Sequence, residues 1–95
     1  MSFMLVTQKV IDFDGWKSKF DGQLHGRRKS GLIDLHIWRD DSDPDTVILL
    51  FGSTDLDKAR EFVSSSDWQT AMRDSGVLDQ SDVKFLNEYR WHQSH

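Results

Sequence analysis

His36 is the residue whose chemistry is best suited to proton transfer. It lies in the stretch 32–39, two residues before Trp38, on the mixed face of an alternating pattern. Imidazole has an unperturbed pKa of about 6.5, so it can accept a proton close to neutral pH. A base of this kind can deprotonate an acidic C–H or a phenol. We therefore predict His36 as a catalytic base. The alternative is a histidine at a subunit interface, or one bonded to a neighbouring carbonyl.

Amide, phenol and guanidinium groups could hold a ligand beside such a base. Gln8, Gln23, Asn87 and Tyr89 can supply hydrogen bonds to a polar ligand. Each could equally be a buried or interfacial group that the backbone satisfies. Arg27 could bind a carboxylate or an enolate; the alternative is that its stem lies along the core and its head stays in water.

Aromatic residues are the predicted walls of a pocket for such a ligand. Trp16 and Phe20 lie four residues apart, the spacing that brings two side chains to one face of a helix. Trp38 alternates with His36 in a predicted strand. Aromatic side chains at helical spacing are commonly part of the core, so core packing is the alternative for each of them.

Composition excludes several other chemistries and partners. The chain has no cysteine, which removes thiolate catalysis and disulfides. It has no glycine-rich phosphate loop and no serine elbow. His92 and His95 lack a carboxylate or cysteine partner, so we predict a polar tail at 92–95 and no metal site there. A net charge of −4 argues against nucleic acid as a partner.

The start of the chain and its apolar runs bear on the cellular location of the protein. The start lacks the basic and long apolar regions of a signal peptide, and no apolar run reaches the ~20 residues of a membrane span. We therefore expect a cytoplasmic protein without a membrane partner. A length of 95 residues fits one domain over residues 1–95.

The period of the apolar residues predicts the elements that position these side chains. Apolar positions two apart predict strands over 3–10, 32–39 and 81–91, and the short continuous apolar run 46–51 predicts a fourth strand. Positions three and four apart predict helices over 13–30 and 55–76, the second interrupted at 64–67. In 32–39, strict alternation assigns Ile33, Leu35 and Ile37 to one face and Asp34, His36 and Trp38 to the other. The acidic, proline-containing stretch 40–45 is a predicted turn.

The order of these elements predicts an α+β fold. The order βαββαβ is that of a ferredoxin-like unit, with a four-stranded antiparallel sheet, the first and third strands central and the last at an edge. The run 46–51 is apolar on both faces, whereas two helical regions can cover only one face of a sheet. Because a large exposed apolar patch is rare on a monomer, we predict a homodimer whose sheets pack face to face.

These features run along nearly the whole chain and resemble the dimeric α+β barrel superfamily. That group includes antibiotic-biosynthesis monooxygenase-like proteins and polyketide cyclases. The stretches that carry the resemblance are 4–6 with Lys9-Val10, 14–17, Leu35-His36 with Arg39, 43–51, 55–60, Ala71-Met72 with Gly76-Val77, and Phe85-Leu86. In small relatives a histidine is expected where Gln8 stands and another where Gln23 stands. Trp68 is compatible with the haem-degrading branch, but no histidine follows it at a fitting place.

The resemblance implies a small monooxygenase or cyclase that needs neither metal nor flavin. Its aromatic or polyketide-like substrate would lie between the sheet and the helices, against Trp16 and Phe20. The alternative is a non-catalytic dimeric module that binds a small ligand or a protein partner. The glutamines at positions 8 and 23 favour that alternative.

Overall fold

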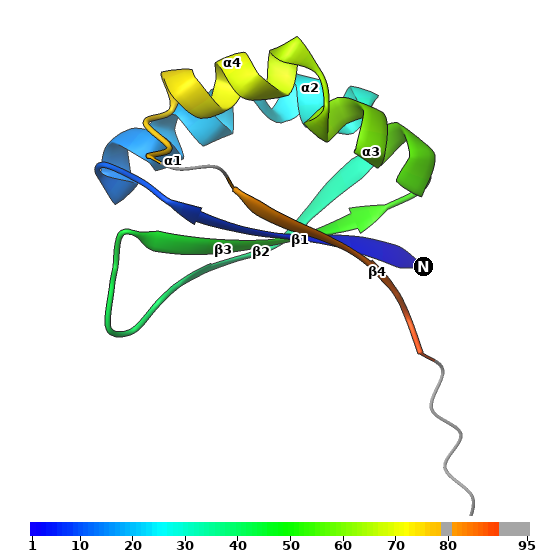
Figure 1. Ribbon diagram of the computed structural model, residues 1–95, viewed down its shortest axis with the longest axis horizontal. Helices are drawn as coiled ribbons and strands as arrows, with labels where there is room; N and C mark the ends of the chain where they lie inside the picture. The colour runs from blue at the N-terminus through cyan, green and yellow to red at the C-terminus, as the bar shows by residue number, and fades with distance from the viewer. Residues whose placement is uncertain (79–80, 90–95) are drawn as a thin grey trace, which may run out of the picture.

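A four-stranded antiparallel sheet carries all the described helices on one of its faces (Figure 1). The computed structural model describes residues 1–78 and 81–89. The predicted extension of the last strand to Trp91, the tail at 92–95 and its two histidines lie outside these residues. The elements are β1 (Ser2–Lys9), α1 (Phe13–Gly22), α2 (Leu24–Lys29), β2 (Leu32–Arg39), β3 (Thr46–Ser53), α3 (Leu56–Val63), α4 (Ser66–Asp74) and β4 (Asp82–Asn87).

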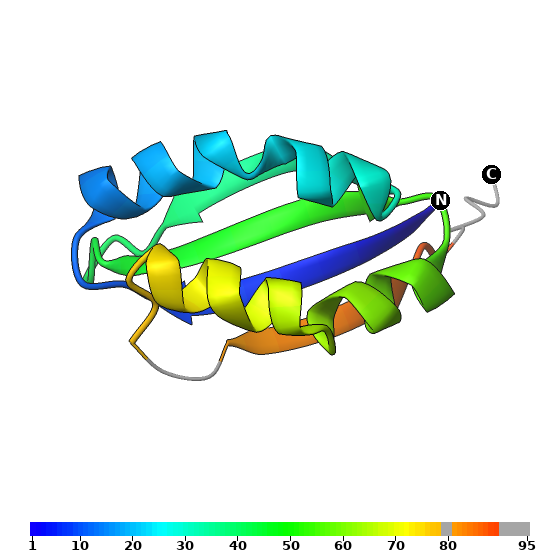
Figure 2. The same ribbon diagram turned by 90° about the horizontal axis from the view of Figure 1, so that it is seen from above.

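The strand order is β2-β3-β1-β4, with every neighbouring pair antiparallel. The predicted fold is therefore confirmed: the first and third strands are central and the last lies at an edge. Each predicted helical region consists of two helices. Figure 2 shows α1 and α2 as one row above the sheet and α3 and α4 as a second row beside it. Within the described residues, no helix has the length and apolar character to cross a membrane.

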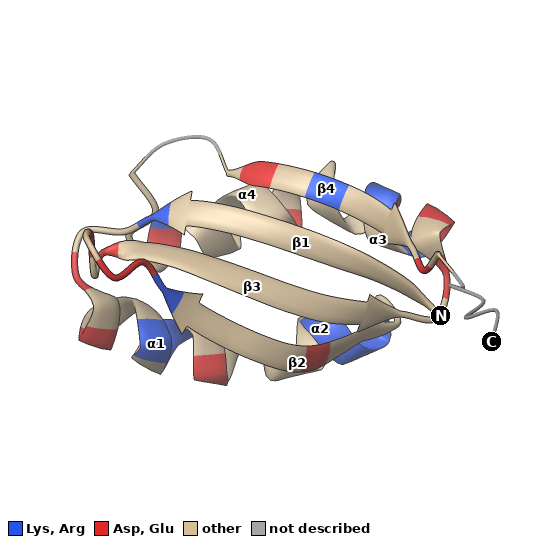
Figure 3. Cartoon of the chain, turned by 90° about the horizontal axis from the view of Figure 1, so that it is seen from below, with Lys and Arg blue, Asp and Glu red and all other residues tan. Residues whose placement is uncertain are grey.

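Alternation along the two central strands separates a covered face from an open one. Met4 and Val6 of β1 lie opposite Phe51 and Leu49 of β3, and all four are buried beneath the helices. The intervening residues, such as Leu5 opposite Leu50, point to the face without helices. Figure 3 views this open face and shows charged residues mostly at strand ends and on the edge strands.

Side-chain caps and glycines set where the helices begin and end. Asp12 accepts a hydrogen bond from the Gly15 N–H at 2.9 Å and so begins α1. Asp55 caps α3 by accepting from the N–H of Asp57 at 3.0 Å. Gly31 ends α2 with a φ of 77°, in the left-handed region that suits glycine. Thr54 and Asp57 have the spacing of a capping box, but the side chain that caps α3 is that of Asp55.

A β-bulge in β2 corrects the predicted alternation of that strand. Residues 32–34 pair in step with β3, but the register shifts between Asp34 and His36, so Leu35 is the extra residue. Asp34 therefore faces the helices, opposite Phe51, while His36 lies opposite Leu50 on the open face. After the bulge Ile37 packs against the covered core. Predicting one wholly apolar face and one mixed face was wrong, because a single inserted residue reverses the phase of the strand.

The predicted turn at 40–45 is held by its own carboxylates. Asp40 accepts hydrogen bonds from the hydroxyl and the N–H of Ser42, each at 2.8 Å. These bonds stabilise the charged form and lower the pKa of Asp40 below its ordinary value. A hydrogen bond from the Thr46 hydroxyl, followed by one from Lys9, lowers the pKa of Asp43 in the same way. The turn is thus closed by local hydrogen bonds at the end of the sheet.

A glycine pair tests the backbone requirement at the end of α2. In Gly31→Ala the new Cβ would lie 2.6 Å from the Thr54 hydroxyl, at a φ of 77°. We expect unfolding in urea to show a loss of about 1–2 kcal/mol. The control is Gly22→Ala in α1, where a Cβ meets nothing within 4 Å. This control should keep or gain stability, so an equal loss in both variants would contradict the assignment.

Candidate functional site

A small cavity lies between the sheet and the two rows of helices. Its volume is about 30 Å³, and residues of β1, β3 and all four helices line it. The residues that matter below are Gln8, Phe20, Gln23, Arg27, Trp68 and Met72. We call this space the inner cavity. A volume of this size holds one or two water molecules, so a larger ligand needs a side chain to move.

A larger cleft opens beside the inner cavity, between α4 and β4. The described residues around it include Trp68, Met72, Val77, Ser81 and Val83, and its volume is about 930 Å³. We call it the outer cleft. Trp68 and Met72 line both spaces. These two side chains therefore stand between the two spaces, which we together call the sheet–helix pocket.

Gln8 is the polar group of β1 within this apolar pocket. Its side chain is 2% exposed because β1 is central and the helices cover this face. Its Nε2 donates to the thioether sulfur of Met72 at 2.8 Å. Its Oε1 has no hydrogen-bond donor among the described residues. Leaving a buried acceptor unpaired costs about 1–3 kcal/mol, which is unusual in a folded protein.

Arg27 holds the far wall of the inner cavity through an ion pair in which the arginine is buried and the Asp34 side chain is 33% exposed. The arginine residue is only 5% exposed, so the alternative of a head group in water is wrong. Nε and Nη2 donate to the two carboxylate oxygens of Asp34 at 2.9 and 2.8 Å, and Nη1 donates to the carbonyl of Phe20 at 2.7 Å. The guanidinium also lies 3.6 Å from the centre of the Phe20 ring. Arg27 thus positions Phe20 and already has a carboxylate partner.

Gln23 and Trp16 support the pocket in different ways. Gln23 donates from Nε2 to the carbonyl of Ala71 at 3.4 Å, a contact that joins the two rows of helices. Trp16 stacks on Phe20 with ring centres 4.9 Å apart and is 1% exposed. Of the two, only Gln23 lines the inner cavity. For Trp16 the structure supports the core-packing alternative.

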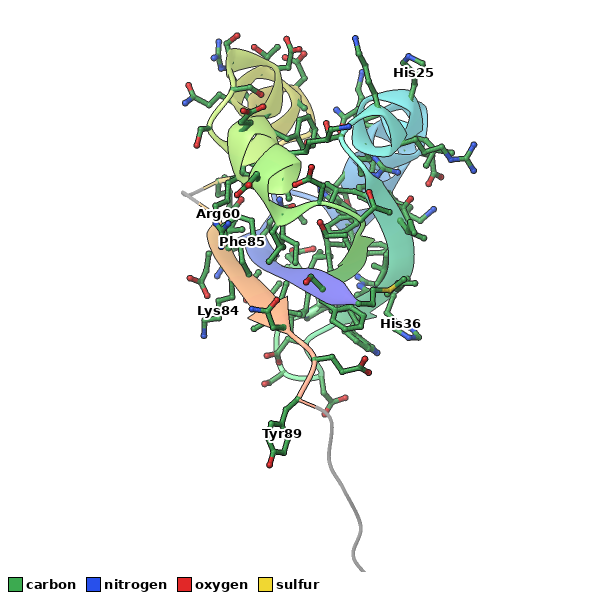
Figure 4. All side chains as sticks on the ribbon, turned by 90° about the vertical axis from the view of Figure 1, so that its right-hand side faces the viewer. His25, His36, Arg60, Lys84, Phe85 and Tyr89 are labelled. Carbon is green, nitrogen blue, oxygen red and sulfur yellow. The ribbon has the colours of Figure 1, made fainter. Side chains whose placement is uncertain are left out.

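His36 and Trp38 lie on the other face of the sheet, away from this pocket. Their rings stack at 4.9 Å, and they pair with Leu50 and Ile48 of the open face. Figure 4 shows His36 below the helical layer that carries His25. Placing His36 and Trp38 in one pocket with Phe20 was therefore wrong, because the bulge at Leu35 and the alternation of β3 turn them outward.

The predicted ligand groups of the last strand also lie apart from the pocket. Asn87 accepts a hydrogen bond from the Ser2 hydroxyl at 2.9 Å, where β1 and β4 pair. Tyr89 is 86% exposed and projects beyond the sheet (Figure 4). Neither residue lines the inner cavity or the outer cleft.

Sequence reasoning did not assign Met72 to the site. Helical spacing places Trp68, Ala71 and Met72 on one face of α4, which was the available signal. That spacing does not say which strand residue the face meets. The contact between Met72 and Gln8 joins residues 64 positions apart, so it appears only in the folded chain.

Comparisons with known proteins find similarity in structure alone. No protein-family model matches the chain, and no curated protein matches it. A solved structure from Bordetella bronchiseptica, titled "Putative antibiotic biosynthesis monooxygenase", superposes with a TM-score of 0.75 at 12% identity over 94% of this chain and 97% of that one. A protein titled antibiotic biosynthesis monooxygenase gives a TM-score of 0.66 at 10% identity, covering 95% of this chain and all of that one (100%).

A third similar structure is an uncharacterized NIPSNAP domain protein from Burkholderia xenovorans. It matches with a TM-score of 0.64 at 14% identity, over 99% of this chain and 100% of that one. These coverages confirm that the whole chain has the fold of the antibiotic-biosynthesis monooxygenase-like proteins. The identities are too low to carry over an activity.

A double-mutant cycle tests the ion pair that holds the far wall. We expect Arg27→Met, Asp34→Leu and the double variant to give a coupling energy of about 1–3 kcal/mol in urea unfolding. The reason is that loss of Asp34 leaves the buried guanidinium of Arg27 without its carboxylate partner. The matched control is the exposed pair Lys17–Asp21, at 2.6 Å, with an expected coupling of about 0.3–0.5 kcal/mol. Equal coupling energies in the two cycles would show that the burial of Arg27 does not strengthen its interaction with Asp34.

Proposed function

We propose that this protein is a small cofactor-independent monooxygenase- or cyclase-like protein that acts on an aromatic or polyketide-like molecule in the sheet–helix pocket. The observation that carries the proposal is the pocket itself. Its inner cavity has aromatic and aliphatic walls and only a few polar groups, which is the usual make-up of a small-molecule site. The likeness in fold to proteins named antibiotic biosynthesis monooxygenases supports the same class of chemistry.

An oxygenation without a cofactor requires a substrate that supplies the electrons. A methylene group between an aromatic ring and a carbonyl can lose a proton, and the resulting carbanion reduces O₂. The CH₂ group then becomes C=O, one oxygen atom enters the product, and the other leaves as water. In this scheme the protein orients the substrate and excludes solvent. Gln8 is the polar group that can hold the substrate carbonyl beside the apolar walls.

The alternative of a non-catalytic ligand-binding module is favoured by one specific observation. Among the described residues that line the inner cavity, none is a histidine or a carboxylate. His36, the predicted base, pairs with Leu50 on the opposite face. Proton removal within the inner cavity would therefore depend on the acidity of the substrate itself. Binding without turnover is the simpler outcome if the natural ligand lacks such an acidic position.

A variant with a filled inner cavity, assayed for both binding and turnover, distinguishes a monooxygenase from a ligand-binding module. We expect Ala71→Phe to weaken binding of 2-tetralone, whose activated methylene makes it a suitable probe, by about tenfold or more, because Ala71 lines the cavity. His36→Ala should leave binding unchanged, since His36 lies on the other face. Binding is measured by equilibrium dialysis and turnover by oxygen uptake. Oxygen uptake by the unchanged protein that is lost in Ala71→Phe supports the monooxygenase. Binding of 2-tetralone without oxygen uptake supports the ligand-binding module.

The open face of the sheet supports assembly into a homodimer. Four of its large apolar residues are about 40% exposed, namely Ile33 (43%), Leu35 (40%), Trp38 (45%) and Leu86 (37%). They surround the partly exposed Leu5 and Leu50 of the central strands. A contiguous apolar surface of this kind is rarely left in water. A second copy related by a two-fold axis would present the same surface to it.

A charge at the centre of this face tests the dimer. We expect Leu50→Lys to raise the dissociation constant by more than about a hundredfold, because a sheet-to-sheet contact would bury an unpaired ammonium. Light scattering should then give 11.1 kDa for the variant and twice that mass for the unchanged protein. Ile11→Lys is the control, since Ile11 is exposed outside the sheet. A monomeric unchanged protein would refute the assembly.

A further inference from the structure

The side-chain amide of Gln8 is buried with both of its polar atoms poorly matched. Its Nε2 donates to a thioether, which is a weak acceptor. Its Oε1 receives no hydrogen bond from the described residues. A glutamine that is 2% exposed normally finds better partners, because an unmatched amide costs stability without adding packing. The mismatch is concentrated at the wall of the inner cavity, where a ligand could correct it.

Met72 stands between this amide and the outer cleft. Its sulfur accepts from Gln8 Nε2 at 2.8 Å and lies 3.8 Å from the Ser81 hydroxyl on the cleft side. It lines both the inner cavity and the outer cleft. A methionine side chain has three rotatable bonds and packs adaptably. Met72 can therefore turn into the roomy outer cleft without movement of the backbone of α4.

We propose that the Met72 side chain is a displaceable plug that closes the inner cavity until a ligand pushes it aside. The ligand then presents to Gln8 a neutral polar edge, with one hydrogen-bond acceptor and one donor on neighbouring atoms. The acceptor takes the hydrogen bond from Gln8 Nε2, and the donor satisfies Gln8 Oε1. A lactam, a primary amide or a protonated carboxylic acid has such an edge. This inference rests on the proposed function of the sheet–helix pocket and names the ligand chemistry that the pocket selects.

The dimensions of the two spaces place the rest of the ligand. The inner cavity, about 30 Å³, admits only the polar edge in the position that the sulfur leaves. The outer cleft, about 930 Å³, has room for one or two fused rings. Trp68 lines both spaces, so its indole can contact those rings as they enter.

The charges around the amide favour a neutral edge over an anionic one. A carboxylate has two acceptors, so one of its oxygens would face Gln8 Oε1 and repel it. Arg27 is the cation on the cavity wall, and its guanidinium is already held by both oxygens of Asp34. An anion in the inner cavity would therefore lie in an apolar space without a free cation among the residues that line that cavity. The inner cavity selects for complementary hydrogen bonding, not for charge.

Three probes of similar shape test this inference by equilibrium dialysis. The first, 2-quinolone, carries an N–H and a C=O on neighbouring atoms. In the second, N-methyl-2-quinolone, the donor is blocked, and naphthalene carries neither group. We expect the protein to bind 2-quinolone about tenfold more tightly than its N-methyl form, because the blocked form leaves Gln8 Oε1 unpaired. In Gln8→Leu that ratio should fall to about one, while naphthalene binding persists.

Variants of Met72 test the plug independently of Gln8. Met72→Ala should strengthen 2-quinolone binding several-fold, since no side chain has to be displaced. His25→Ala, a change at an exposed position of α2, is the control and should alter no value. Binding of 2-quinolone should also shift the NMR signals of the Gln8 side-chain NH₂ in the unchanged protein. That readout decides the role of Gln8 even if Gln8→Leu does not fold.

The outcomes separate the inference from the proposed function. Equal affinities for 2-quinolone and its N-methyl form would overturn the hydrogen-bonding inference, while leaving the aromatic pocket in place. Weaker binding of 2-quinolone by Met72→Ala would overturn the plug. Failure of all three probes to bind would overturn both the inference and the proposed function.

Discussion

The structure depends on one constraint: a sheet that is apolar on both faces has helices for only one of them. In β3, Val47, Leu49 and Phe51 face the helices, while Ile48 and Leu50 face away. Burying the first set stabilises the monomer by the usual apolar transfer, about 25 cal/mol per Å². Ile48 and Leu50 contribute a comparable stabilisation only if another surface covers them. This division assigns the two faces different tasks: the covered face encloses a pocket, and the open face is free to meet a partner.

The bulge at Leu35 shows how one residue can redistribute chemistry between these faces. Without it, Asp34 and His36 would share a face; with it, Asp34 turns to the helices and His36 turns to the open side. Asp34 then holds the guanidinium of Arg27, which in turn orients Phe20 through its carbonyl and its ring. In this ion pair the guanidinium is buried and the carboxylate is partly exposed, so the buried charge requires its partner and the pair fixes the position of the Arg27 side chain. The wall of the pocket is therefore built by a local irregularity in an edge strand.

The pocket retains polar groups that do not improve the packing. An apolar residue in place of Gln8 would remove an unpaired acceptor, so the glutamine is costly for stability alone. Features that lower stability without a structural return are expected where a protein binds or reacts. Met72 is well placed for such a role, because its sulfur partly satisfies the amide and its flexible chain can move aside. This arrangement links the packing of α4 on β1 to the chemistry that the pocket can accept.

The sequence alone determined the order of the elements and the ferredoxin-like topology, which follow from periods of two and 3.6 residues along the chain. It also determined the two-sided character of 46–51, which follows from an unbroken apolar run. It also identified Gln8, Phe20, Gln23 and Arg27, four of the residues that line the inner cavity. It could not predict the bulge, since Leu35 looks like any other apolar residue in an alternating strand. Only the tertiary structure decided that His36 and Trp38 lie on the open face, that Arg27 is taken by Asp34, and that Met72 meets Gln8. These contacts depend on register and on the packing of distant segments, and no local pattern of residue types encodes them.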